Sequence, residues 1–335
     1  MTSPLVPRPS PLVPAVSVFA AARRIDGIVR RTPLRHSPGL SEIAGGDVYL
    51  KCEQEQITGS FKLRGAFNTL AALPNDVRAR GVVASSAGNH GLGVAYAARH
   101  FGIPATIYVP ATAPQVKKRG IAALGATVDD SQPDYDAAHA AAQADAAEHG
   151  KLFVNPCLGD TVLAGQGTVA LEIVSELPAV ACVVVCVGGG GLLGGIASFV
   201  RRVAPHVRIA GSQGVNTAAM ARSLAAGRVV EIPNAPTLAD GLAGQIDESA
   251  LAIGRASLDE IVTLTEAELA LTIAWLAHHQ GAVVEGAGAA AAGAVLHRKL
   301  RELPTPAAVI LSGGNIDRER FDAAVAEAEA LAGAP

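Results

Sequence analysis

The chain has 335 residues, of which 50% are hydrophobic and 17% are charged, and its formal net charge is -3. A chain of this length can bury a substantial core in one large or two medium domains. This charge balance supplies no basic field for nucleic acid or for an anionic membrane surface, so neither partner is expected. The four cysteines do not form the pattern of a disulfide scaffold.

The N-terminal residues 1–14 are rich in proline and are expected to form a loose arm. Prolines interrupt the apolar part of this region, and the pair Arg23 and Arg24 follows that part, whereas an export signal has its positive charges first. No apolar run approaches the roughly 18 to 20 residues that a membrane span needs. The sequence therefore predicts a cytoplasmic protein.

Beyond the arm, short β-rich runs alternate with stretches of helical periodicity. Strands are predicted at 48–52, 81–84, 106–109, 127–129, 152–154, 182–187, 208–211, 261–264 and 308–311. Helices are predicted at 89–100, 114–124, 135–148, 161–177 and 266–279. This alternation predicts an α/β fold with parallel sheets that helices cover on both faces. The continuous apolar runs near 182–187 and 308–311 agree, because strands buried on both faces need not alternate in polarity.

Lys62 lies in the stretch "TGSFKLRGA", 58–66, where a helix is expected to start. Its neighbours Phe61 and Leu63 are apolar, and an apolar setting disfavours the ammonium form and exposes a nucleophilic amine. The alternative is a solvated residue in the first turn of a helix. Arg64 is expected to be structural, paired on the helix surface or holding a neighbouring loop.

Three glycine-rich turns follow predicted strands: "SSAGNHG" at 85–91, "VGGGGLLGG" at 187–195 and "LSGGNID" at 311–317. Ligands of such sheets bind at the carboxyl ends of the strands. Four consecutive glycines between a strand and a helix let backbone N–H groups approach an anion, and the helix N-terminus adds partial positive charge. A phosphate is the expected ligand. The run matches neither a P-loop nor a clean dinucleotide fingerprint.

The segments "TGSFKLRGA", "SSAGNHG", "VGGGGLLGG" and "LSGGN" occur in the order seen in fold type II pyridoxal-phosphate enzymes. The chain most resembles their threonine/serine dehydratase and serine racemase group, from "RTPL" at Arg31 to beyond Ile316. The resemblance implies two parallel-sheet domains of the tryptophan-synthase-β-like architecture. A large domain would comprise 15–79 and 156–335, a small domain 80–155, and the enzyme would be a homodimer.

The resemblance implies that Lys62 forms a Schiff base with pyridoxal 5'-phosphate and later acts as the general base at the substrate Cα. Phe61 would pack on one face of the pyridine ring, Asn89 would hydrogen-bond the phenolic oxygen, and Ser312 would face the ring nitrogen. The residues expected to hold the phosphate are Gly188, Gly189, Gly190, Gly191 and Leu192.

The substrate carboxylate is expected to bind the loop that follows the strand at 81–84, through backbone N–H groups and one hydroxyl. The residues of this loop are Ser86, Ala87, Gly88, Asn89 and His90. Asp240 and Gly241 resemble a segment on the substrate side, and Glu285 resembles a glutamate near the ring; all three could equally be structural.

The implied activity is α,β-elimination of water from L-threonine or L-serine, which gives a 2-oxo acid and ammonia. A serine at the ring nitrogen cannot fix a positive charge there, which favours prompt loss of a β-leaving group over transamination. One alternative is a dehydratase for a bulkier amino acid of the phenylserine or hydroxyaspartate type. A second is a racemase, which Ala87 disfavours because racemases of this group carry a serine there. The non-enzyme alternative is a nucleotide-binding protein.

No metal site is predicted. Many relatives bind a divalent cation through carboxylates in the segment after the strand at 208–211, but Gln213 and Ala219 stand at those positions here. A hard cation prefers several oxygen ligands, charged ones above all. Cys182 and Cys186 share one face of a predicted buried strand, so both are expected to be core residues. Chelators are therefore expected to leave the activity almost unchanged.

Overall fold

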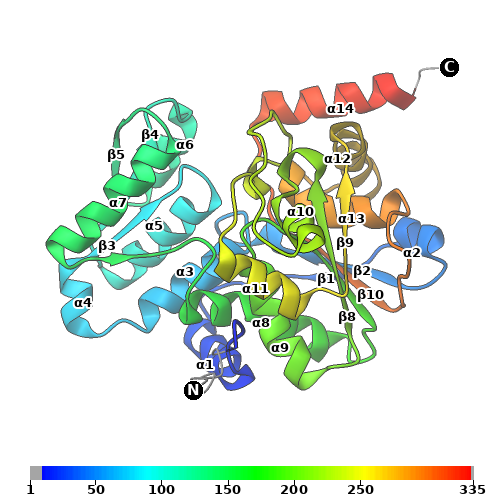
Figure 1. Cartoon of the computed structure of the whole chain (residues 1–335), viewed down its shortest axis with the longest axis horizontal. Helices are drawn as coiled ribbons and strands as arrows, with labels where there is room; N and C mark the ends of the chain where they lie inside the picture. The colour runs from blue at the N-terminus through cyan, green and yellow to red at the C-terminus, as the bar shows by residue number, and fades with distance from the viewer. Residues whose placement is uncertain (1–9, 333–335) are drawn as a thin grey trace, which may run out of the picture.

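The computed structural model describes residues 10–332, and its strands form two separate sheets. Figure 1 shows the larger sheet on the right and the smaller one on the left, each with its own helices. In the described part, no helix is both long enough and apolar enough to cross a membrane.

The larger sheet is parallel except at one edge. Its strands in spatial order are β1 (Leu34–His36), β2 (Val48–Cys52), β10 (Ala307–Leu311), β7 (Cys182–Cys186), β8 (Arg208–Gly214) and β9 (Glu260–Leu264). Only β1 is antiparallel to its neighbour. The sequence did not predict β1, because this three-residue strand has two exposed residues and no apolar run to mark it.

Helices cover both faces of the larger sheet, as predicted. On the central strand β7, Val183 and Val185 belong to the core shared with α8 (Asp160–Glu176) and α9 (Gly191–Val203). Val184 belongs to the opposite core, which includes α13 (Gly286–Leu296). The strand is buried throughout, which explains its continuous apolar sequence.

The smaller sheet is parallel and uses only residues between 82 and 153. Its strands in spatial order are β5 (Thr127–Gln132), β4 (Ala105–Pro110), β3 (Val82–Ser85) and β6 (Leu152–Phe153). Its helices are α5 (Asn89–Phe101), α6 (Gln115–Ala123) and α7 (Tyr135–His149). The helix α3 (Lys62–Ala71) packs against both α5 and α8, so it joins the two halves of the molecule.

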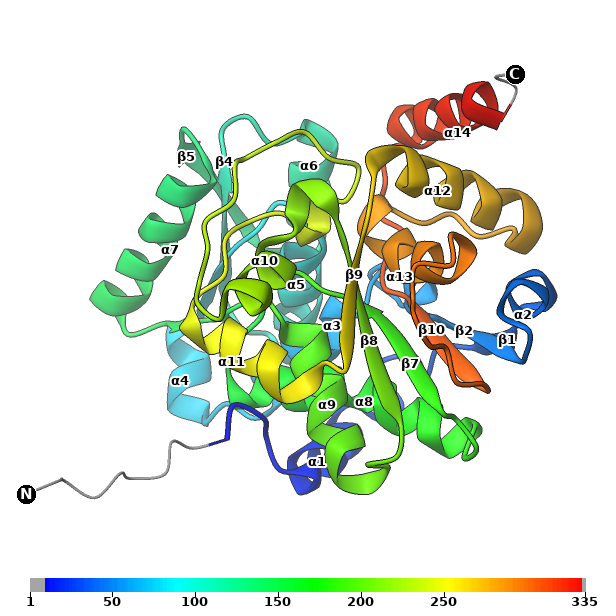
Figure 2. The same cartoon turned by 45° about the vertical axis from the view of Figure 1, so that its right-hand side comes forward.

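The remaining helices lie around the large sheet and at the N-terminal edge of the small one. They are α1 (Ala15–Ile25), α2 (Pro38–Ala44), α4 (Asn75–Arg80), α10 (Ala219–Ala226), α11 (Glu248–Ser257), α12 (Glu266–Gln280) and α14 (Arg318–Ala332). Figure 2 shows α14 lying along α12 at the C-terminal end. A capping box of Thr265 and Glu268 starts α12.

Most of the predicted arm, residues 1–9, lies outside the described residues. The part that is described is packed against the protein: Val13 is buried, and its amide donates to Ser198 Oγ at 3.1 Å. Anchoring therefore begins before the first helix, so at least this end of 1–14 is not loose.

Candidate active site

A pocket lies at the carboxyl ends of β7 and β10, between the glycine-rich turns. The residues predicted as functional that line it are Phe61, Lys62, Asn89, Gly188, Gly189, Gly190, Gly191, Leu192 and Ser312. They come from four distant segments of the chain. Gly241 and Glu285, whose roles the sequence left open, also line it.

Lys62 is the first residue of α3, and its side chain enters the pocket. Its Nζ donates to the carbonyl oxygen of Pro156 at 2.8 Å and lies 3.8 Å from Cys157 Sγ. The same nitrogen lies 5.3 Å from the centroid of the Phe61 ring. The amine is thus held among apolar and weakly polar groups, which does not support the alternative of a solvated helix residue.

The glycine turn 188–191 connects β7 to α9, and two of its four positions leave no room for a side chain. A Cβ on Gly189 would lie 2.8 Å from Cys157 Sγ, and one on Gly191 would lie 2.9 Å from Cys157 Cα. Gly190 has φ +88°, a conformation that favours glycine, and it caps α9 without any side-chain cap. Amide groups at the start of α9 are therefore available, together with the helix dipole, to an anion in the pocket. This cradle fits the phosphate of the implied cofactor.

Asn89 is the centre of a hydrogen-bond network across the pocket. Its Nδ2 donates to Glu285 Oε1 at 2.7 Å, and its Oδ1 accepts from Asn315 Nδ2 at 2.6 Å. Asn315 also donates to the carbonyl of Thr58 at 2.8 Å, so its amide is fixed. The network determines which way the Asn89 amide faces. Sequence reasoning assigned no role to Asn315, and only its place in "LSGGN" could have signalled one.

Glu285 precedes α13 and is buried at the pocket wall. Burial, reinforced by the negative charge of Asp240, raises the pKa of its carboxyl from 4.5 to about 7. Its Oε1 lies so close to Gly313 that a Cβ there would approach within 2.5 Å. A carboxyl group that titrates near neutral pH therefore faces Asn89.

Glu285→Gln is expected to reduce the pH dependence of stability. The pKa of the Glu285 carboxyl is raised in the folded state. The contribution of this carboxyl to the free energy of unfolding is therefore fully present below about pH 4.5 and is lost as the pH rises through about 7. For the cofactor-free wild type, this loss is about 3 kcal/mol. Urea unfolding measures the free energy of unfolding as a function of pH. Glu285→Gln should give a flatter profile than wild type, whereas the exposed control Glu248→Gln should give the wild-type profile. Equal slopes for wild type and Glu285→Gln would contradict the assignment.

Ser312 is the first residue after β10, and its hydroxyl is buried on the pocket wall. Its Oγ accepts from Cys186 Sγ at 3.3 Å and lies 3.5 Å from the carbonyl of Ala287. Cys186, expected to be a core residue, is buried but also lines the pocket. Cys157, which also lines the pocket, had no sequence signal because a single cysteine in a loop forms no pattern.

The predicted substrate loop meets the pocket through Asn89. Ser86 Oγ accepts from the amide of Gly88 at 3.2 Å, and Ala87 packs against the core of the small sheet. His90 is buried and donates from Nε2 to the carbonyl of Val154 at 2.7 Å. Burial and the nearby Lys62 charge lower the pKa of His90 to about 3, so it stays neutral near pH 7. Its contact anchors the loop to the end of β6.

Arg64 is structural, as expected, but it is fully buried, so the alternative that placed it on the helix surface is wrong. Its guanidinium pairs with Glu53 at 2.8 Å and with Glu172 of α8 at 2.6 Å, and Glu172 also accepts from Lys51 Nζ at 2.6 Å. The positive charges of two buried cations are thus neutralised by two carboxylates, and one of these cations, Arg64, lies two residues after Lys62 on α3.

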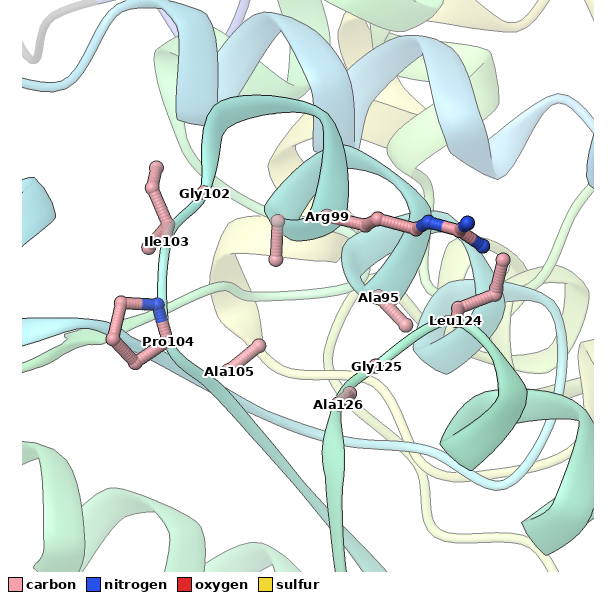
Figure 3. A pocket seen from close by; sticks show the side chains of 10 residues that line it. Ala95, Arg99, Gly102, Ile103, Pro104, Ala105, Leu124, Gly125 and Ala126 are labelled. Carbon is pink, nitrogen blue, oxygen red and sulfur yellow. The ribbon is translucent and has the colours of Figure 1, made fainter.

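A second pocket lies in the small sheet, between the end of α5 and the turn before β5 (Figure 3). Of the residues that line it, only Arg99 is charged, and the others are mainly alanine, glycine and aliphatic side chains. No set of polar groups converges there, so the pocket around Lys62 is the candidate active site.

Comparisons with known proteins identify a family. The family described as "Pyridoxal-phosphate dependent enzyme" matches residues 25–313. The chain is 44% identical to an L-threonine ammonia-lyase of Thermotoga maritima, over 90% of this chain and 75% of that protein. It is 40% identical to the L-threonine ammonia-lyase of Geobacter sulfurreducens, over 96% and 80%. Among solved structures, maize serine racemase superimposes with a TM-score of 0.88 at 28% identity, covering 96% of this chain and 99% of that one.

Proposed function

The chain belongs to the family of pyridoxal-phosphate-dependent enzymes, and from this premise we propose that it is an ammonia-lyase that dehydrates L-threonine and L-serine. The products are a 2-oxo acid and ammonia. The observation that carries the proposal is the position of Lys62 Nζ in the same pocket as the glycine turn 188–191 and Ser312.

Different residues of the pocket would bind different parts of the cofactor. We assign its covalent attachment to Lys62, its phosphate to the turn 188–191 with Leu192, and one face of its ring to Phe61. Asn89 would hydrogen-bond the phenolic oxygen, and Ser312 would face the ring nitrogen. When bound, pyridoxal phosphate supplies an electron sink for negative charge at the substrate Cα.

Lys62 has a second role in the proposal. Once the amino acid has displaced it, its amine is free at the position from which it removes the Cα proton. The carbonyl of Pro156, 2.8 Å from Nζ, would hold the amine there. Ser312 presents a neutral hydroxyl, which favours loss of the β-hydroxyl over transamination.

The substrate loop of Ser86, Ala87, Gly88, Asn89 and His90 is assigned to the amino-acid carboxylate. Support comes from its position after β3, with Asn89 on the pocket wall and His90 fixed to Val154. The serine racemase alternative is weaker, because two relatives of 40–44% identity are named L-threonine ammonia-lyase, whereas a serine racemase of Bos taurus is 35% identical and the maize serine racemase 28%. Ala87 also offers no acid or base.

The function is tested with purified protein and a panel of hydroxy amino acids. L-Threonine and L-serine should each release a 2-oxo acid and ammonia, whereas phenylserine and hydroxyaspartate should be poorer substrates, and chiral chromatography should detect little D-serine. If either bulky substrate is turned over faster than L-threonine and L-serine, or if D-serine is the main product, the proposed function is wrong and the corresponding alternative is correct.

We further propose two domains, a large one of 15–79 and 156–335 and a small one of 80–155, in a cytoplasmic homodimer. The two separate sheets support the division, and α3 at their junction would let the small domain close over substrate. Light scattering should give the mass of a dimer, and crystal forms with and without substrate should differ in interdomain angle.

A further inference from the structure

Gln213 ties the glycine turn to the rest of the large sheet. It lies near the end of β8 and is fully buried. Its Nε2 donates to the carbonyl oxygens of Val187 at 2.8 Å and Thr217 at 2.9 Å, and its Oε1 accepts from the amide of Ala221 at 2.9 Å. Both N–H bonds and the oxygen of the carboxamide are thus directed at three backbone groups.

These three groups belong to three separate segments, one of which leads directly into the glycine turn. Val187 directly precedes the turn 188–191, Thr217 ends the short 3₁₀ helix Val215–Thr217, and Ala221 is in the first turn of α10. Two buried carbonyls therefore converge on one point, and without a partner each would be costly to bury. The two N–H bonds of Gln213 Nε2 are directed at these carbonyls and satisfy both.

A divalent cation does not fit this arrangement. The N–H groups of Gln213 point toward the two carbonyls that would have to ligate it, and Ala219 carries no side-chain oxygen. Within residues 10–332, no group of three or more histidine, cysteine, aspartate or glutamate side chains is placed to hold a metal. The cation site that carboxylates at 213 and 219 would form is replaced by hydrogen bonds.

We infer that the Gln213 carboxamide is a built-in substitute for a divalent cation and a positioning residue for the glycine turn. It holds the Val187 carbonyl and so sets the start of the phosphate cradle. The inference rests on one part of the proposed function, the assignment of the cofactor phosphate to the glycine turn, and not on the reaction itself. It explains how the chain can keep the turn aligned without any metal.

The positioning role is tested with Gln213→Met, which keeps the length of the side chain and removes its hydrogen bonds. Binding of pyridoxal phosphate to the cofactor-free protein, followed by absorbance, should weaken about tenfold or more. Ser212→Ala is the matched control: its buried Oγ donates to Ala290 on the other side of β8, so the variant should bind the cofactor like wild type. Wild-type affinity in Gln213→Met would overturn the inference.

The substitute role is tested with Gln213→Glu, which places a carboxylate against two carbonyls and so creates a site of oxygen ligands. Millimolar Mg²⁺, Mn²⁺ or Ca²⁺ should raise the melting temperature of this variant and recover its cofactor affinity. The same cations, or a chelator, should leave wild type unchanged. A variant that folds only with cation supports the inference even if Gln213→Met does not fold. It is overturned if no cation stabilises Gln213→Glu, or if wild type itself responds.

These readouts are separate from the reaction. If wild type binds pyridoxal phosphate and shows the expected variant pattern but eliminates no water from threonine or serine, the proposed function fails and the Gln213 inference stands. If elimination is confirmed and Gln213→Met binds the cofactor normally, the reverse holds.

Discussion

Lys62→Ala is expected to lower kcat for release of 2-oxo acid from L-threonine by roughly 10³-fold or more. The substitution removes the covalent attachment and the base at once. No other lysine lines the pocket that the structure describes around Nζ, so no neighbour can take over either role. The variant should retain the fold, because Lys62 contributes one hydrogen bond to a carbonyl and one weak contact to a thiol.

Steady-state kinetics and the melting temperature, measured together, check this prediction. Lys62→Arg should be almost as inactive, because guanidinium keeps the charge and cannot act as the amine. Lys151→Ala, which removes a lysine paired with Asp145 of α7, should keep wild-type activity. A Lys62→Ala protein that retains more than about a tenth of the wild-type kcat would exclude this lysine from the chemistry.

Glu172→Ala is expected to destabilise the protein by about 3–5 kcal/mol, because it leaves buried positive charge uncompensated. In wild type the cations Arg64 and Lys51 are balanced by the carboxylates of Glu53 and Glu172. Removal of Glu172 leaves Lys51 without its ion-pair partner, and Arg64 with Glu53 alone. Since Arg64 lies two residues after Lys62, part of the loss should appear as disorder at the start of α3.

A matched control lies on the same helix. Glu176, the last residue of α8, pairs with Arg31 at 2.7 Å on the surface, where the two side chains are 29% and 57% exposed. Glu176→Ala should cost less than about 1 kcal/mol. Urea unfolding of the two variants separates the buried network from the exposed pair. Similar losses would show that Glu172 has no special electrostatic role.

The elements that the sequence predicted are those with local signals. Strands such as β7 and β10 are short runs of apolar residues between breakers. The turn 188–191 is recognisable because it consists of four consecutive glycines. Lys62 could be singled out because an amine between apolar neighbours is unusual. The end of β8 was placed at Gly211, three residues early, because Ser212, Gln213 and Gly214 lack β-propensity and are in the strand through pairing with β9.

What the sequence did not predict depends on contacts between distant residues. Arg64 meets a partner 108 residues away in Glu172, and Asn315 meets Asn89 across 226 residues. Neither contact has a local pattern, so Arg64 was open to a surface reading and Asn315 received no role. The same holds for Gln213. The sequence showed that a glutamine replaces an acidic residue there, but it could not show which carbonyls the amide would bind, because these come close only when β7 and β8 pair.

The most direct test of the account is the identity of the lysine that carries the cofactor. The purified holoprotein is reduced with borohydride, digested and mapped by mass spectrometry. The account predicts a pyridoxyl phosphate adduct on the peptide that contains Lys62, and none on the peptide of Lys51, which lies buried in an ion pair only 11 residues earlier in the chain. An adduct on any other lysine, or no adduct in a protein saturated with the cofactor, would contradict it.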